Sequence, residues 1–251
     1  MISLHIQDLV AGYGKKTIVP GLSLAPLRGG QVVGLLGPNA SGKSTLMKSI
    51  AGVQPVHSGE VHLRVDGQQL SERETRKAIG YVPQDLPKSA ALTAFETVVV
   101  AGRRRLGSKL AKYRAAEVMS ELGIVELAER YLSDLSGGQR QMVAVAQMLV
   151  TEPDVLLLDE PTSALDLHRQ LFLLSDLRQR VRDSGALAIV AIHDINLAAR
   201  FCDELVVIKH GELQAQGAPA EVLEPQLLHE VYGVNADILE HDGVPVICAV
   251  G

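Results

Sequence analysis

Three short segments combine residue types that could bind and cleave a nucleotide phosphate. The first reads G-x-x-x-x-G-K-S, a loop whose backbone N–H groups cradle phosphates. An apolar run at residues 32–36 precedes it and a helix-compatible segment at 43–51 follows it, which is the context such a loop requires. Lys43 adds a mobile cation, and the Ser44 hydroxyl is placed to bind Mg²⁺. The expected phosphate-binding residues are Gly37, Pro38, Asn39, Ala40, Ser41, Gly42, Lys43, Ser44 and Thr45.

The second segment is the acidic pair Asp159-Glu160, at the end of an apolar run that predicts a buried parallel strand. We expect Asp159 to hold Mg²⁺ through its water shell while Ser44 binds the ion directly. Glu160, close to a γ-phosphate, can orient and deprotonate an attacking water, which is a general-base role. The plainer alternative is a capped strand end, but two adjacent buried acids without a cation would be costly.

The third segment, Leu135-Ser136-Gly137-Gly138-Gln139, predicts another anion-binding site. Its two glycines allow close backbone approach, Ser136 offers a hydroxyl, and the following helix offers its N-terminus. One nucleotide cannot easily use both sites of one chain if a helical insertion separates them. Two copies arranged head to tail would instead let Ser136 of one copy cap the γ-phosphate held by Lys43 of the other.

The elements that must position these segments alternate between strand and helix. Residues 2–6 alternate apolar with polar and predict a half-exposed strand, with residues 23–27 as its hairpin partner. Strands at 32–36, 78–82, 154–159 and 186–192 predict an α/β sheet with the site at its carboxyl edge. Residues 85–135 read as several helices. A hairpin around residues 210–211 and a β pair around 241–243 close the chain. Tyr13, in a mobile bend, is either a surface turn residue or a platform for a base.

Composition sets further bounds. A chain of 251 residues predicts one domain with a substantial insertion, and 47% hydrophobic but only 3% aromatic residues predict an aliphatic core. A net charge of −5 gives no electrostatic case for nucleic acid as a partner. Cys202 and Cys248 are expected to be reduced core residues. The sequence shows no apolar stretch of about 20 residues and no signal peptide, so we expect a cytosolic chain, free to dock onto a membrane protein.

Together the motifs resemble the ATP-binding cassette ATPases over almost the whole chain. The resemblance implies ATP and Mg²⁺ as ligands and a P-loop NTPase (RecA-like) α/β core with an N-terminal antiparallel β subdomain and an inserted helical subdomain. It implies a single domain, residues 1–251, divided into a core of 1–84 and 154–251 and a helical subdomain of 85–153. By resemblance Tyr13 stacks on adenine, Gln84 senses Mg²⁺ and couples to the insertion, and His193 contacts the γ-phosphate. The implied catalytic set is Lys43, Gln84, Glu160 and His193; Ser44, Gln84 and Asp159 bind the metal, Ser136 to Gln139 match the family signature, and Asp166 lies in the loop that contacts the partner subunit.

Two positions depart from the commonest family pattern. Ala40 stands where the family usually has glycine, which could disfavour a positive φ and alter the phosphate loop. Gln147 stands where many members carry arginine, and we expect little catalytic consequence from this change.

Three segments outside the catalytic motifs resemble ATPases that energise uptake of ferric siderophores, haem or cobalamin. They are residues 95–98, residues 193–198 and the run from 217–223 through 231–234. The resemblance implies a second copy of the chain and membrane permease subunits as partners, a substrate-binding protein as an indirect one, and a peripheral place on the cytoplasmic face of the inner membrane. The alternatives are a zinc or manganese importer, a non-transport cassette protein, a small-molecule kinase and a binding module without turnover.

Overall fold

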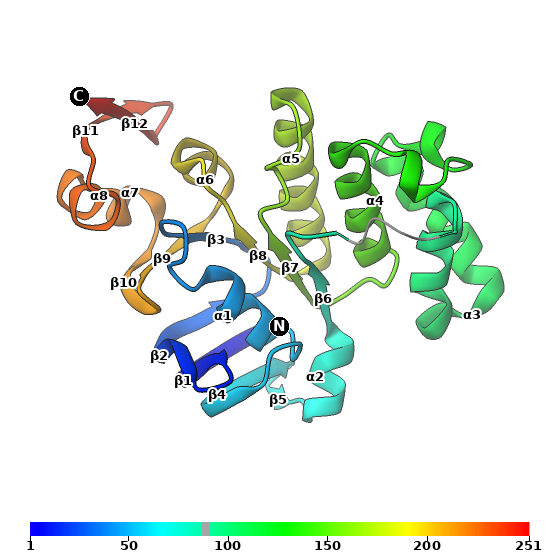
Figure 1. Cartoon of the computed structure of the whole chain (residues 1–251), viewed down its shortest axis with the longest axis horizontal. Helices are drawn as coiled ribbons and strands as arrows, with labels where there is room; N and C mark the ends of the chain where they lie inside the picture. The colour runs from blue at the N-terminus through cyan, green and yellow to red at the C-terminus, as the bar shows by residue number, and fades with distance from the viewer. Residues whose placement is uncertain (87–90, 251) are drawn as a thin grey trace.

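The protein is described here from a computed structural model, which covers residues 1–86 and 91–250. Residues 87–90, which fall in the predicted helical insertion, and residue 251 lie outside the described residues. The architecture consists of a central parallel sheet, an antiparallel sheet, a group of helices and a C-terminal hairpin (Figure 1).

The central sheet has the strand order β10-β9-β3-β8-β7-β6, and only β10 runs antiparallel to its neighbour. Every residue of β3, β7 and β8 is buried, as expected for aliphatic strands covered on both faces. This arrangement confirms the predicted α/β class. The strands are β3 (Val32–Leu36), β6 (Ile79–Val82), β7 (Val155–Asp159), β8 (Leu187–Ala191), β9 (Glu204–Lys209) and β10 (Glu212–Gly217).

The antiparallel sheet has the order β2-β1-β4-β5 and confirms the predicted N-terminal layer. Leu4 pairs with Leu27 on one side and with Leu63 on the other. The predicted mobile bend at residues 12–14 was wrong in one respect, because Gly12 and Tyr13 still pair with β2 and belong to β1. The strands are β1 (Ile2–Tyr13), β2 (Lys16–Arg28), β4 (Val56–Val65) and β5 (Gln68–Gln69).

The segment between β6 and β7 is helical where the structure describes it, as predicted. Thr93 with Glu96, and Ser136 with Gln139, form capping boxes that begin its two long helices. The first helix breaks at Gly107 (φ 74°, ψ 166°), so it consists of two helical pieces that meet at a kink. The division of the chain at residues 84 and 154 stays a prediction. The helices are α3 (Ala94–Glu121), η1 (Val125–Leu127), η2 (Leu132–Asp134) and α4 (Gly137–Leu149).

The remaining helices flank the central sheet, and a separate hairpin forms the C-terminal end (Figure 1). Cys202 is buried as predicted, and burial raises the pKa of its thiol to about 12. Cys248 is only half-buried, so the prediction that it is a core residue was wrong. It lies on a separate two-stranded hairpin, which other elements do not cover on both faces. The elements are α1 (Lys43–Ile50), α2 (Glu72–Ala78), α5 (Leu167–Ser184), α6 (Ile195–Phe201), α7 (Pro219–Val222), α8 (Pro225–Tyr232), β11 (Asn235–His241) and β12 (Val244–Val250).

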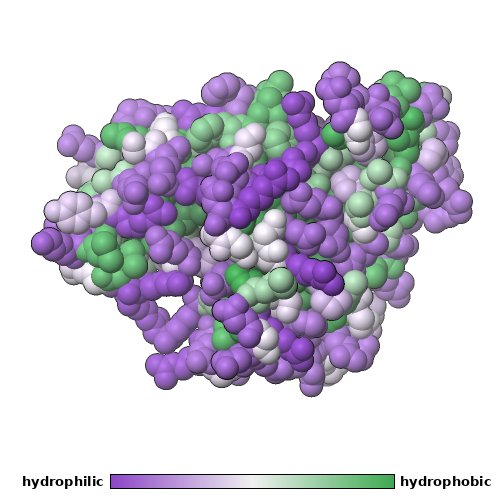
Figure 2. Space-filling view, turned by 180° about the vertical axis from the view of Figure 1, so that it is seen from behind, coloured by the Kyte–Doolittle hydropathy of each residue, from purple (hydrophilic) through white to green (hydrophobic). Residues whose placement is uncertain are grey.

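Hydrophilic residues cover most of the face seen in Figure 2, with apolar residues in scattered groups between them. None of the helices in the described residues combines the length and the apolar character needed to cross a bilayer.

The aliphatic core gives a stability prediction. Leu157 in β7 is 0% exposed, whereas Leu110 in α3 is 55% exposed. Leu157→Ala should lower the free energy of unfolding by about 2–5 kcal/mol, because it removes buried methyl groups and leaves a cavity. Leu110→Ala, the same chemical change at the surface, should cost less than about 0.5 kcal/mol. Urea unfolding of both variants checks this, and equal losses would contradict the assignment of β7 to the core.

Candidate functional site

The register of the central sheet brings the predicted site residues to one edge. Ala191 in β8 pairs with Leu35 in β3 and with Asp159 in β7. Because these strands are parallel, the segments that follow them leave the sheet together, at its carboxyl edge. The phosphate loop follows β3, Glu160 follows β7, and His193 follows β8. On the other side of β7, Val82 pairs with Leu158, which places Gln84 beside Glu160.

The phosphate loop is built on glycines that nothing larger could replace. Gly37 has φ 149°, and a Cβ there would lie 2.1 Å from the Ile208 carbonyl oxygen. Gly42, with φ 106°, is the N-cap of α1, so the amides of the first helical turn face the loop. Lys43 is 5% exposed and its Nζ donates to the carbonyl oxygens of Gly37 (2.7 Å) and Pro38 (3.1 Å). Burial lowers the pKa of Lys43, although Glu160 and Asp159 oppose that shift.

Ala40 adopts the left-handed conformation, with φ 61°. A Cβ is unfavourable there by about 1–2 kcal/mol, which is why glycine is the residue that suits the position. The departure noted in the sequence is therefore a strained residue inside the loop, and the loop keeps the left-handed backbone despite it.

Asp159 and Ser41 leave polar atoms that fit a nucleotide and its metal. Asp159 is 1% exposed and Ser41 2%, and within the described structure Asp159 Oδ1 and Ser41 Oγ have no hydrogen-bond partner. Burial raises the pKa of Asp159, while a hydrogen bond from the Ser44 hydroxyl opposes the rise. A buried carboxylate with a free oxygen beside a serine hydroxyl suits Mg²⁺, which binds few protein oxygens and completes its shell with phosphate and water. The residues present therefore fit Mg²⁺ with a bound nucleoside triphosphate.

Glu160 is held from two sides. Gln84 Nε2 donates to its Oε2 at 2.7 Å, and His193 Nε2 lies 2.5 Å from its Oε1. The Glu160 side chain is 11% exposed and that of His193 43%. Glu160 also has a positive φ of 53°, which is unusual for a residue other than glycine and marks a constrained turn at the strand end. The structure thus brings three predicted catalytic residues into direct contact.

The predicted second anion-binding segment does not reach the phosphate loop of its own chain in the described structure. The Ser136 side chain caps α4 by accepting from Gln139 N at 3.3 Å, and Gln139 Oε1 accepts from Ser136 N at 2.9 Å. In Figure 1, α4 stands across β6, β7 and β8 from α1. A Cβ on Gly138 would lie 2.7 Å from the Ala164 carbonyl oxygen, so this segment packs on the loop that ends at Asp166.

Two further predicted residues lie at the margins of the site. Asp166 is exposed and caps α5, its Oδ1 accepting from Arg169 N at 2.9 Å. Tyr13 is 49% exposed at the tip of the β1–β2 hairpin. Gln54, which follows α1, donates from its side chain to the Gly12 carbonyl and so ties that hairpin to the helix after the phosphate loop.

Tyr81 is a site residue that the sequence analysis missed. Its hydroxyl donates to Asp159 Oδ2 at 3.4 Å, and burial raises its pKa, so the phenol stays protonated as a donor. The signal in the sequence was weak: Tyr81 is one aromatic residue in a chain with few, on a strand that lacked any motif. Only the pairing of Tyr81 with Leu157 shows that it neighbours the acidic pair.

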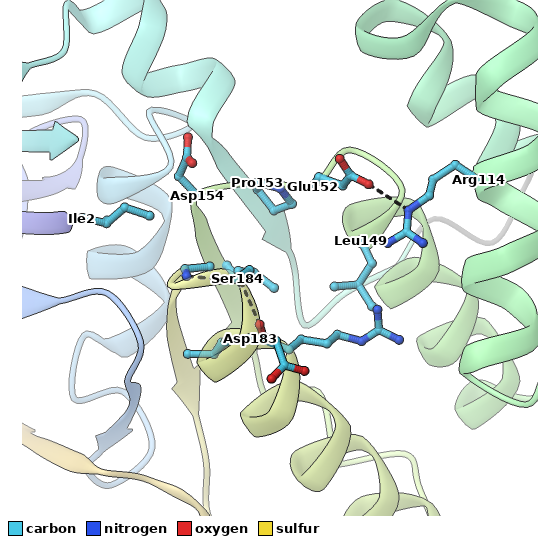
Figure 3. A pocket seen from close by; sticks show the side chains of 12 residues that line it. Ile2, Arg114, Leu149, Glu152, Pro153, Asp154, Asp183 and Ser184 are labelled. Atoms are coloured by element: carbon cyan, nitrogen blue, oxygen red, sulfur yellow. Dashed lines mark hydrogen bonds and ion pairs between the residues drawn. The ribbon is translucent and has the colours of Figure 1, made fainter. Parts of the chain in front are cut away.

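A cavity of about 430 Å³ lies at the opposite edge of the sheet, where Asp154 precedes β7 (Figure 3). Both arginines that line the cavity are paired with glutamates. Arg114 Nε lies 2.9 Å from Glu152 Oε1, and Arg180 Nη1 lies 2.8 Å from Glu121 Oε2. These pairs tie α3 to the end of α4 and to α5, so the cavity is a junction between elements rather than a second nucleotide site.

The strain at Ala40 predicts that glycine stabilises the protein at this position, whereas the same substitution at a control position destabilises it. Ala40→Gly should stabilise the protein by about 0.5–1 kcal/mol, because relief of the left-handed conformation exceeds the added entropy of the unfolded chain. Ala116→Gly, at an exposed helical position in α3, should cost about 1 kcal/mol. Thermal unfolding should show a rise of roughly 1–3 °C for the first variant and a fall for the second. A fall for both would contradict the strain.

Known proteins match this chain over its whole length. Residues 22–163 match the family model described as ABC transporter. The chain is 35% identical to the hemin import ATP-binding protein HmuV of Photobacterium damsela subsp. piscicida, over 99% of this chain and 97% of that protein. It is 34% identical to the iron(3+)-hydroxamate import ATP-binding protein FhuC of Bacillus subtilis, over 95% and 91%.

The fold agrees with these relatives. The dimeric ATP-binding cassette MJ0796, solved in a post-hydrolysis state with ADP and Pi, superposes with a TM-score of 0.76 at 26% identity, over 86% of this chain and 98% of that one. The predicted P-loop NTPase core with a helical subdomain is thereby confirmed. The chain belongs to the ABC transporter family, as one of its ATP-hydrolysing subunits.

Proposed function

We propose that the chain energises import of an iron–siderophore complex, haem or a cobalamin-type compound through a separate membrane permease. The observation that carries the catalytic part is the Glu160 carboxylate, held between Gln84 and His193 at the end of the strand next to the phosphate loop. The substrate class rests on the relatives HmuV and FhuC, whose names state import of hemin and of iron(3+)-hydroxamate.

In the proposed reaction, Lys43 and the loop amides hold the phosphates of ATP. A water attacks the γ-phosphorus, the bond to the bridging oxygen of ADP breaks, and Glu160 takes the proton from the water. Both Glu160 oxygens are engaged in this structure. Each carboxylate oxygen can accept a second hydrogen bond, so the attacking water can bind to Glu160 while Gln84 and His193 stay in contact with it. Mg²⁺, held by Ser44 and Asp159, would supply charge neutralisation on the phosphates.

We infer that two copies complete each nucleotide site. Ser136 is exposed and caps α4, and Figure 1 shows α4 across β6, β7 and β8 from α1, the helix that follows the phosphate loop. A head-to-tail pair would bring the Ser136 to Gln139 segment of one copy to the phosphates held by the other, with Asp166 and its loop at the contact and Tyr13 on the adenine. The cassette MJ0796 was solved as a dimer, which supports this assembly.

The proposed partners and location follow from the import function. Permease subunits would dock beside Gln84, and the paired copies would close on ATP and reopen after hydrolysis. The chain would then lie on the cytoplasmic face of the inner membrane, and a substrate-binding protein would deliver the compound from the other side.

One prediction tests Glu160 as the general base. Glu160→Gln should bind ATP normally and lower the rate of hydrolysis by about 10²–10³-fold, because the amide cannot accept the proton from water. Glu240→Gln, the same change at an exposed position on β11, serves as the control and should leave the rate unchanged. Steady-state phosphate release together with ATP binding checks this. Undiminished turnover in the Glu160 variant would remove the base assignment.

Another prediction tests which compound is imported. The chain, co-purified with its permease and reconstituted in vesicles, should show ATP-dependent uptake of an iron–siderophore complex, haem or cobalamin, and Glu160→Gln should abolish that uptake. Zinc and manganese ions serve as comparison substrates. Uptake of these ions alone would overturn the proposed substrate class in favour of a metal-ion importer.

A further inference from the structure

Asn196, three residues after His193, forms two hydrogen bonds with the backbone of the C-terminal hairpin. Its Oδ1 accepts from the Ile247 amide at 2.7 Å, and its Nδ2 donates to the Ile247 carbonyl oxygen at 3.2 Å. In an antiparallel strand both polar groups of one residue point to the same side. Ile247 therefore turns them toward α6 and away from β11, and the Asn196 amide takes the place that a neighbouring strand would have.

The helix that carries Asn196 depends on such contacts. α6 has only seven residues, and helices this short are marginal without packing. Asp194 caps it by accepting from Asn196 N at 2.9 Å and Leu197 N at 3.1 Å. His193 directly precedes this cap, so the placement of α6 decides where the imidazole of His193 lies relative to Glu160.

The hairpin is itself anchored on the core, and the helix before it reaches the phosphate loop. Ile238, Val244 and Ile247 pack against the main hydrophobic core. The helix that leads into the hairpin ends at Tyr232, whose phenol oxygen faces the backbone N–H of Gly37 in the phosphate loop. Burial raises the pKa of Tyr232 to about 12, so the phenol remains neutral. The C-terminal segment thus reaches both the phosphate loop and the helix that follows His193.

We propose that Asn196 is a positioning residue: by bonding both polar groups of Ile247, it lets the C-terminal hairpin fix α6 so that His193 Nε2 reaches the Glu160 carboxylate. The inference rests on the hydrolytic function proposed above. It assigns a role in positioning His193 to two segments, residues 194–198 and the C-terminal hairpin, that hold no residue of the predicted catalytic set. A plain anchoring role for Asn196 would affect stability and leave the His193–Glu160 contact unchanged.

The test compares three variants of the full chain with the unsubstituted protein. Asn196→Ala removes both hydrogen bonds, and Asn196→Asp keeps an acceptor for the Ile247 amide but places a carboxylate against the Ile247 carbonyl. An aspartate in the first turn suits a helix N-terminus, so the second variant should fold even if the first does not. Leu239→Ala, at a 57% exposed position on β11, is the control for a harmless change in the hairpin.

The first readout needs no nucleotide. The imidazole signal of His193 is followed by NMR in ¹³C-histidine-labelled protein, and it is assigned by its loss in His193→Ala. We expect this signal to shift or broaden in both Asn196 variants and to stay unchanged in Leu239→Ala. An unchanged signal in a folded Asn196 variant would overturn the proposal.

The second readout is ATP hydrolysis. Both Asn196 variants should lose about 10- to 100-fold in kcat, since small displacements of a catalytic group cost that much, while KM for ATP stays near its original value. In a His193→Ala background, Asn196→Ala should cause no further loss. Equal losses in both backgrounds would overturn the positioning role. If His193→Ala itself keeps full turnover, the proposed hydrolytic role of His193 fails, whatever the Asn196 variants do.

Discussion

The structure depends on one constraint: the parallel strands of the central sheet end in register. The pairing of Ala191 with both Leu35 and Asp159 fixes where the phosphate loop, the acidic pair and His193 leave the sheet. The residues that meet there carry buried charge, because Lys43 and Asp159 are almost fully covered. Buried ions are tolerated only when other charges or polar groups satisfy them. The fold therefore maintains a site with buried charged and polar atoms that a nucleotide with its magnesium ion can satisfy.

The two contacts of the Glu160 carboxylate join the proposed base to two other parts of the fold. Gln84 begins the segment that leads to α3, whereas His193 precedes α6, and both contact the same carboxylate. We therefore expect a displacement of either segment to alter the contacts of the Glu160 carboxylate. The Ser136 segment lies elsewhere, packed through Gly138 on the loop before Asp166. In the proposed dimer, that loop and that segment of one copy would meet the partner's nucleotide together.

Much of this organisation could be predicted from the sequence because it depends on local patterns. Glycine spacing and aliphatic runs predicted the phosphate loop, the helix that follows Ser136, and the parallel strands. Contacts between distant segments could not be predicted in this way. The hydrogen bond from Tyr81 to Asp159 follows only from strand pairing, and the grip of Asn196 on Ile247 joins residues 51 positions apart. Local composition also gave one wrong prediction. Cys248 lies in an apolar run that predicted a core position, but on the C-terminal hairpin the residue is only half-buried. The strain at Ala40 required the observed backbone angle.

The central claim, that each nucleotide site is shared between two copies, can be tested with differently tagged chains purified as mixed dimers. In one dimer a copy carries Lys43→Ala and the other carries Ser136→Arg; in the second dimer one copy carries both substitutions and the other carries none. Shared sites leave one complete site in the first dimer and none in the second, so we predict ATP hydrolysis only in the first. Hydrolysis only in the second dimer would contradict the account, because it would mean that each chain forms its site alone.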